Sequence, residues 1–291
     1  MALDLTPVLR MSDEEFRLIR DSINRHCGLY FEDNLKYLLE RRLARRVEQR
    51  LFKSFREYER FLRYDPSRRD ELDEIVELLT TQETYFFRES YQFDALVEEV
   101  LPELVARKRA KRESHIRFWS AGCSSGEEPY SLAMILACQP QLAGFEWEVF
   151  ASDISRSALQ RARQAVYRSH SFRNGVPSEC NRFFEEETGG NRRVREEIRR
   201  RVTFSALNLL DRDRLSLVRR LDVVFCRNVI IYFDTATKRQ VIDLFHEKIE
   251  PGGFLFLGHS ESLINLSTKF DLRHFRSDLV YQKAAKEGAA P

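Results

Sequence analysis

The amino-acid sequence predicts an α/β fold in which a mostly parallel sheet, covered by helices on both faces, follows a small all-helical domain. Residues 12–80 show helical periodicity throughout, whereas short β-rich runs alternate with helical segments from about residue 115 onward. A charged, glycine-containing stretch at 168–201 interrupts this alternation. Because apolar strands separated by amphipathic helices form parallel sheets, we expect a helical domain at 1–80 and a sheet domain at 81–291, with an inserted β subdomain at about 168–201.

Composition narrows the possible functions. The chain has 291 residues, a formal net charge of +2 and five scattered cysteines that are never spaced as CxxC. Such cysteines argue against a disulfide framework and a zinc site, and the near-neutral charge does not mark a nucleic-acid binder. The N-terminus lacks the apolar core of a signal peptide, and no apolar run approaches the roughly 18 residues that span a bilayer. We therefore expect a cytoplasmic protein with no metal and no membrane insertion. We also expect it to act as a monomer.

The second helix of the N-terminal domain, expected at about 33–51, is basic and amphipathic. Leucine and valine recur every four residues along one face. The other faces carry five arginines, namely Arg41, Arg42, Arg45, Arg46 and Arg50. A run of arginines on a helix is most often a solvated face, although it could also serve nucleic acid or an anionic membrane.

The expected strands of the sheet are five short apolar runs, at 116–120, 147–152, 202–206, 221–226 and 254–259. Helical segments separate these runs, which favours parallel pairing. Two more runs, FDLRHF and LVYQK, follow near the C-terminus and predict a closing hairpin.

The turn after the first strand, SAGCSSGEEPYS, carries the main functional signal. Gly122 and Gly126 allow a ligand to approach the backbone closely, and the helix that follows favours negative charge at its N-terminus. Glu127 and Glu128 would repel a pyrophosphate, so the turn favours a cationic, phosphate-free nucleotide such as S-adenosylmethionine. Asp153, at the end of the second strand, is placed to accept the ribose hydroxyls. Acids also stabilise helix N-termini and cap helices, so structural roles for these carboxylates stay open.

Four separated strings resemble one family: TQETYFFRE at 81–89, SAGCSSGEEPYSLA at 120–133, FCRNVIIYFD at 225–234 and LGHSES at 257–262. They resemble the chemotaxis receptor glutamate O-methyltransferases, the CheR family, over nearly the whole chain. The resemblance implies a Rossmann-like class I methyltransferase sheet that binds S-adenosyl-L-methionine and yields S-adenosyl-L-homocysteine. It also implies glutamate methylation on the cytoplasmic helical domain of chemoreceptors, with the basic helix at about 33–51 facing the receptor and no nucleic-acid partner.

The resemblance further implies roles for individual residues. Glu128 would contact the methionine ammonium and Asp153 the ribose, whereas Arg88 and Tyr232 would be catalytic. The predicted cofactor-binding residues are Gln82, Thr84, Arg88, Gly122, Glu128, Asp153, Asn208, Leu209, Arg227 and Asn228. The family usually has Asn where this chain has Gln82, which lengthens that arm by one methylene. Whether Glu127 or Glu128 holds the ammonium depends on register alone.

A glutamate substrate fits the residue inventory. A carboxylate with a pKa near 4.3 is already ionised at neutral pH, so it can attack the sulfonium methyl group without a general base. Two other functions stay open, namely a nucleic-acid methyltransferase, which the absence of DPPY or NPPF tetrapeptides disfavours, and a non-catalytic module of the same fold. The insertion resembles a subdomain with which some family members grip a receptor tether. Its loop, TGGNRR, looks short for that purpose, so we expect no dependence on a tether.

Overall fold

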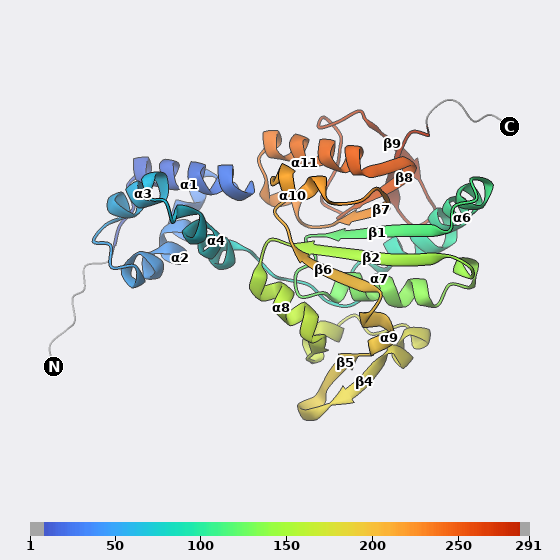
Figure 1. Ribbon diagram of the computed structural model, residues 1–291. Helices are drawn as coiled ribbons and strands as arrows, with labels where there is room; N and C mark the ends of the chain where they lie inside the picture. Colours follow the sequence, from blue (N-terminus) through green and yellow to red (C-terminus); the bar gives the residue numbers. More distant parts are fainter. Residues whose placement is uncertain (1–8, 286–291) are drawn as a thin grey trace. The chain divides into compact units, whose positions relative to one another are not determined.

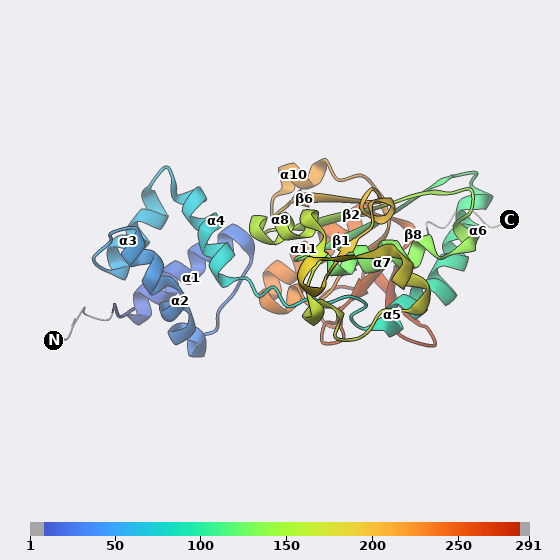
Figure 2. The same ribbon diagram turned by 90° about the horizontal axis from the view of Figure 1, so that it is seen from below.

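The computed structural model describes residues 9–285 and divides them into two compact units. The first unit contains the residues up to Thr81 together with Tyr232–Asp234, and the second contains the rest. Figures 1 and 2 show the helices α1 to α4 of the first unit in blue to cyan. Among the described residues, no helix is both long and apolar enough to cross a membrane.

The first unit is built from four helices: α1 (Asp13–Cys27), α2 (Lys36–Gln49), α3 (Phe55–Tyr64) and α4 (Arg68–Leu79). Ser12 and Glu15 form a complete capping box at the start of α1, and Gly28 ends that helix in the left-handed conformation. The basic helix is shorter than expected because residues 33–35 form a separate 3-10 turn ahead of α2.

The second unit contains a seven-stranded sheet with strand order β6-β2-β1-β7-β8-β10-β9. Its first five strands pair in parallel, and β10 and β9 form the antiparallel hairpin that the sequence predicts. The strand bounds are β1 (His115–Ala121), β2 (Glu146–Asp153), β6 (Val202–Ala206), β7 (Leu221–Cys226), β8 (Ile249–Leu257), β9 (Phe270–His274) and β10 (Leu279–Lys283). The predicted α/β fold is therefore confirmed.

Helices cover both faces of this sheet, with α7 and α8 on one side and α11 on the other (Figure 1). Consecutive residues of β1 point to opposite faces of the sheet, and both faces are apolar. Phe118 lies in the core cluster that includes residues of α7, whereas the Trp119 ring packs edge-on against Phe245 of α11, with ring centroids 5.4 Å apart. The helices of the unit are α5 (Ser90–Ala95), α6 (Leu101–Ala110), α7 (Glu127–Ala137), α8 (Arg156–Gln164), α9 (Glu196–Arg199), α10 (Arg212–Ser216) and α11 (Thr235–Lys248).

A separate three-stranded antiparallel sheet interrupts the alternation between α8 and β6, in the order β3-β5-β4. Its strands are β3 (Val166–Tyr167), β4 (Phe184–Glu187) and β5 (Asn191–Val194). The charged pattern of the sequence becomes cross-strand pairing here, because Glu185 lies opposite Arg193 and Glu186 opposite Arg192. The sheet begins at Val166, two residues before the stretch that the sequence marks as an insertion.

Candidate active site

The turn after β1 brings three strand ends together. The N–H groups of Gly122 and Cys123 both donate to the carbonyl of Ser152 in β2, at 2.8 and 2.9 Å. Gly122 has a φ of +80°, and a Cβ atom there would lie 2.3 Å from Cγ2 of Val229, which follows β7. Only glycine therefore combines this backbone conformation with such close packing.

The other end of the turn is equally tight. Gly126 has a φ of +96° and directly precedes α7. A Cβ atom at this position would lie 2.9 Å from both the Ala162 Cβ in α8 and the Tyr167 hydroxyl. The two glycines thus fix the turn against the end of β7 on one side and against α8 on the other.

The two glutamates that open α7 have different surroundings. Glu127 is only 2 % exposed, and its carboxylate accepts hydrogen bonds from the hydroxyls of Ser125 at 2.8 Å and Ser171 at 3.0 Å. Burial raises the pKa of Glu127. The carbonyl of Ser171 in turn accepts from the Phe86 N–H at 2.8 Å. Glu127 therefore joins the turn to the segment before α5 and to the insertion.

Glu128 faces a different set of charges. Its Oε1 accepts from the Ser120 hydroxyl at 2.6 Å, and its Oε2 lies 3.4 Å from Nε of Arg227. Burial raises the pKa of Glu128, and the neighbouring Arg227 guanidinium opposes that shift. Of the two glutamates, Glu128 is the one whose carboxylate lies among ionised groups.

Arg227, which follows β7, has a buried guanidinium that is incompletely paired. Its Nη2 donates to the carbonyl of Arg88 at 2.6 Å and lies 3.5 Å from Oε2 of Glu89. Its Nε and Oε2 of Glu89 make only these ion-pair contacts, and Nη1 is buried with no hydrogen-bond partner within residues 9–285. Buried polar groups in native proteins are nearly always paired, so the free donor at Nη1 indicates a ligand site.

Asp153 ends β2 and orients the turn. Its Oδ2 accepts from the Ser124 N–H at 2.7 Å, and its Oδ1 accepts from the Ser155 N–H at 2.8 Å. The N-cap of α8 is Ser155, whose hydroxyl accepts from the Ala158 N–H at 3.0 Å. A capping role thus falls to Ser155, while Asp153 holds the glycine turn against the end of β2.

The segment before α5 carries three predicted site residues. Nε2 of Gln82 donates to the Ser155 hydroxyl at 2.8 Å, and its Oε1 accepts from Arg161. The Thr84 side chain is half-buried. Arg88 donates to the carbonyl of Glu83 at 3.1 Å, and its Nε lies 3.9 Å from Oε1 of Glu89. The Gln82 side chain therefore contacts Ser155 at the start of α8, two residues after Asp153.

The loop after β6 carries Asn208 and Leu209. Oδ1 of Asn208 accepts from the Leu210 N–H at 2.9 Å, and the Leu207 N–H donates to the carbonyl of Asp153 at 3.0 Å. Leu209 lines a cavity of about 370 Å³ bordered by residues of α10 and α11. The loop is thus tied to the end of β2 through its backbone.

Tyr232 belongs to the first unit and not to the second. Its carbonyl accepts from the Tyr30 N–H at 2.9 Å, and Phe233 forms a β-bridge with Leu29, so residues 232–234 pack with the N-terminal helices. The pairing of Tyr232 with Arg88 at the reacting carboxylate stays a prediction.

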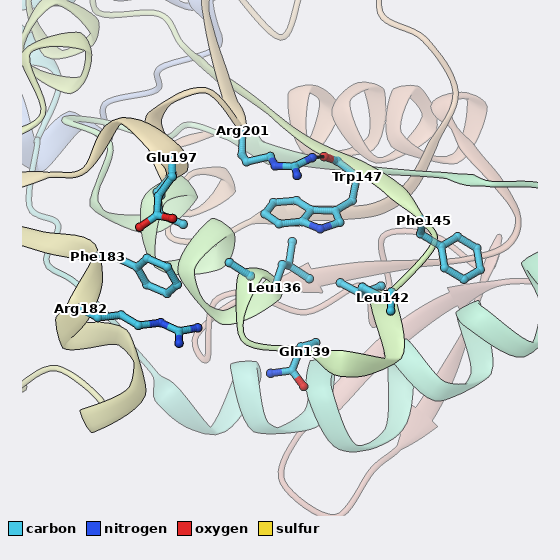
Figure 3. A pocket seen from close by; sticks show the side chains of 12 residues that line it. Leu136, Gln139, Leu142, Phe145, Trp147, Arg182, Phe183, Glu197 and Arg201 are labelled. Carbon is cyan, nitrogen blue, oxygen red and sulfur yellow. Dashed lines mark hydrogen bonds between the residues drawn. The ribbon is translucent and has the colours of Figure 1, made fainter.

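A larger pocket, of about 650 Å³, lies away from these residues. Figure 3 shows the Trp147 ring at its centre, with the Arg201 guanidinium above it and Phe183 to one side. Trp147 is near the start of β2 and Asp153 is at its end, so the pocket lies at the opposite end of that strand. None of the predicted site residues lines it.

Comparison with known proteins decides the family. The model of the CheR methyltransferase SAM-binding domain matches residues 82–278, and the model of the CheR methyltransferase all-alpha domain matches residues 14–80. The chain belongs to the CheR methyltransferase family. The family predicted from the sequence is thereby confirmed, and S-adenosylmethionine is the cofactor of this protein.

Named relatives resemble the chain over almost its whole length. Chemotaxis protein methyltransferase 2 of Vibrio cholerae is 39% identical, over 95% of this chain and 95% of that protein. The chemotaxis protein methyltransferase of Escherichia coli is 37% identical, over 94% and 93%. Chemotaxis protein methyltransferase 1 of Pseudomonas aeruginosa is 36% identical, over 93% and 98%. The protein is therefore an S-adenosylmethionine-dependent methyltransferase of the chemotaxis type.

The side chains of this CheR methyltransferase fit the methionine end of the cofactor. S-Adenosylmethionine carries an ammonium and a carboxylate at that end. Glu128 offers a carboxylate for the ammonium, and the unpartnered Nη1 of Arg227 offers a donor for the carboxylate. No group of three or more potential metal ligands occurs in the part of the chain that the structure describes.

The basic helix of this CheR methyltransferase uses most of its arginines internally. Arg46 donates a bidentate pair of hydrogen bonds to the buried carboxylate of Glu71, at 2.8 and 2.7 Å, and Nε of Arg50 lies 3.3 Å from Oε2 of the same carboxylate. Arg42 donates to the carbonyl of Leu79 at 2.9 Å. Arg41 and Arg45 take no part in these contacts, and both are exposed.

Sequence reasoning missed two acidic residues of this site. Glu89 lies between Arg227 and His259, whose Nδ1 is 2.9 Å from Glu89 Oε1. Glu261 accepts four backbone N–H groups at the ends of β7 and β8. Both lie in strings that carry the family resemblance, TQETYFFRE and LGHSES. Membership in these strings was the only sequence signal that could have pointed to them.

Proposed function

We propose that this methyltransferase transfers the methyl group of S-adenosylmethionine to the side-chain carboxylate of glutamates on the cytoplasmic helices of chemoreceptors. The observation that carries the proposal is the buried group of Glu128, Arg227 and Glu89 near the glycine turn, in which Nη1 of Arg227 has no partner. Such a group suits a zwitterionic amino acid end and disfavours a pyrophosphate. The naming of the relatives as chemotaxis protein methyltransferases supports the receptor as substrate.

The chemistry asks little of the protein beyond binding and orientation. The bound cofactor supplies a methyl group on a positively charged sulfur, which leaves as a neutral thioether. Because the attacking carboxylate is negative and the products are neutral, charge disappears along the reaction, and a site that excludes water favours the transition state. Arg88 would orient the incoming carboxylate through its guanidinium, and Tyr232 would lie near the transferring methyl group.

The remaining predicted residues would hold the cofactor. In this proposal Glu128 contacts the ammonium, Arg227 the carboxylate and Asp153 the ribose hydroxyls. Gln82, Thr84, Gly122, Asn208, Leu209 and Asn228 complete the binding site. Support for the Glu128 role comes from Glu127, whose carboxylate already accepts from Ser125 and Ser171.

The N-terminal domain, residues 1–80, would approach the receptor. Arg41 and Arg45 are exposed on α2, and complementary charge on a glutamate-rich receptor helix would speed and orient the encounter. The protein would act as a cytoplasmic monomer, with residues 81–291 as its catalytic domain and 168–201 as an insertion that needs no receptor tether.

Incubation with labelled S-adenosylmethionine and a purified receptor cytoplasmic fragment tests the proposal. We expect a base-labile methyl ester that disappears when the methylated receptor glutamates are replaced by alanine. Label transferred to RNA or DNA instead would indicate a nucleic-acid methyltransferase. Absence of cofactor binding in calorimetry would indicate a non-catalytic module.

A further inference from the structure

A single carboxylate, that of Glu261, accepts four backbone N–H groups from two chain segments. Oε2 accepts from Gly258 at 2.7 Å and from Asn228 at 2.9 Å. Oε1 accepts from Val229 at 2.9 Å and from Ile231 at 3.2 Å. The carboxylate thereby connects the segment after β7 to the segment after β8.

These contacts leave the Glu261 carboxylate no capacity for a substrate. Each carboxylate oxygen has two lone-pair directions, and each already accepts two hydrogen bonds. Burial raises the pKa of Glu261, while the four backbone donors act in the opposite direction. No lysine or arginine within residues 9–285 forms an ion pair with it, so backbone dipoles balance its charge.

The local sequence is built around this contact. The Glu261 N–H donates to the carbonyl of Gly258 at 2.8 Å, which closes a turn and points the side chain back toward the end of β7. A Cβ atom on Gly258 would lie 2.9 Å from both N and Nδ2 of Asn228. Asn228 itself has a φ of +58°, a left-handed conformation that asparagine tolerates better than most residues other than glycine. The four hydrogen bonds hold the chain in that conformation.

The segment held in this way carries two features of the cofactor site. Arg227, whose guanidinium Nη1 has no partner within residues 9–285, directly precedes Asn228. Val229, which donates to Glu261, packs directly over Gly122 of the glycine turn. A displacement of this segment would therefore move Arg227 and loosen the turn together.

We propose that Glu261 is a positioning residue for cofactor binding: its carboxylate fixes residues 227–231 so that Arg227 and the glycine turn meet the methionine end of the cofactor. This inference rests on the proposed cofactor contacts of Arg227 and Asn228. It makes the acid of the LGHSES string a support for the site and not a group that touches substrate.

Glu261→Gln tests the proposal with almost no change of shape. The amide NH₂ replaces one acceptor oxygen and faces two N–H donors, so two of the four hydrogen bonds are lost. We expect the affinity for S-adenosylhomocysteine, measured by calorimetry, to fall about tenfold or more, with KM for S-adenosylmethionine rising and KM for the receptor fragment unchanged. Amide hydrogen exchange should speed up at Asn228, Val229, Ile231 and Gly258.

Two further variants complete the test. Glu146→Gln, an exposed glutamate at the start of β2, is the matched control and should bind like the wild type. If Glu261 acts through Arg227, Glu261→Gln should have a much smaller effect in an Arg227→Ala background, because coupled residues are not additive.

The outcomes separate this inference from the proposed function. A wild-type protein that does not bind S-adenosylhomocysteine overturns the proposed function. A wild-type protein that binds, with Glu261→Gln binding within twofold and exchange unchanged, overturns the positioning role alone. If Glu261→Gln does not fold, Gly258→Ala carries the test: its Cβ displaces the same segment, so a folded variant with wild-type affinity also refutes the role.

Discussion

Replacing Glu128 by Gln removes one negative charge and keeps the shape of the side chain. A cofactor ammonium about 4 Å from the carboxylate would gain about 4 kcal/mol of attraction at an effective dielectric constant near 20. Burial of Glu128 and its contact with Arg227 at 3.4 Å offset part of that attraction. A charge-assisted hydrogen bond contributes about 2–3 kcal/mol net, so we expect the affinity for S-adenosylhomocysteine to fall roughly 30- to 150-fold.

The pH dependence adds a second signature. Binding of an ammonium requires the ionised form of Glu128, whose pKa is raised by burial. Cofactor affinity should therefore rise with pH through that raised pKa and level off above it, whereas Glu128→Gln should show no such rise. In the cofactor-free protein the sign is opposite: the stabilising contribution of protonated Glu128 is present below its unfolded pKa and is lost as pH rises through the folded pKa.

Calorimetric titration with S-adenosylhomocysteine between about pH 5 and 8 measures both the loss of affinity in Glu128→Gln and the pH dependence of the affinity. Glu127→Gln is the matched control. Because the Glu127 carboxylate accepts hydrogen bonds from Ser125 and Ser171, this substitution should lower thermal stability more than cofactor affinity. The reasoning is refuted if Glu127→Gln loses more affinity than Glu128→Gln, or if Glu128→Gln binds within threefold of the wild type.

Three other perturbations test separate parts of the molecule. Arg46→Ala leaves the buried carboxylate of Glu71 with fewer partners and should destabilise the N-terminal unit by about 2 kcal/mol in chemical unfolding, with unchanged cofactor affinity. Arg45→Glu should leave stability unchanged and slow association with a receptor fragment, most strongly at low salt in stopped-flow measurements; equal rates at all salt concentrations would contradict a receptor-facing helix. Gly122→Ala places a Cβ 2.3 Å from Val229 at a φ of +80° and should lower the melting temperature and the cofactor affinity together.

Strand positions were predictable because burial on both faces leaves continuous apolar runs. LDVVFC forms β7, in which every residue is buried, and the turn after β1 was predictable from glycines, which adopt positive φ more readily than other residues. The two glutamates of the turn could not be told apart, because adjacent helical residues differ by about 100° in direction and only tertiary packing decides which faces Ser171.

The basic helix shows the same limit. Its five arginines look equivalent in sequence, but packing of α4 against α2 uses Arg46 and Arg50 to neutralise Glu71 and Arg42 to cap Leu79. Glu261 was missed because its partners are backbone groups, which leave no compositional trace. Contacts between segments far apart in the chain decide such roles, and local patterns do not encode them.

The double contact of Ser171 has a practical consequence for engineering. Its hydroxyl reaches Glu127 and its carbonyl receives the Phe86 N–H, so the start of the insertion is built into the scaffold around the glycine turn. A chimera that exchanges the β4–β5 hairpin with that of a relative should therefore join the chains after Ser171 and keep β3 of this chain. A graft that begins earlier would import a foreign neighbour for the α7 N-terminus and compromise methyl transfer for reasons unrelated to the exchanged hairpin.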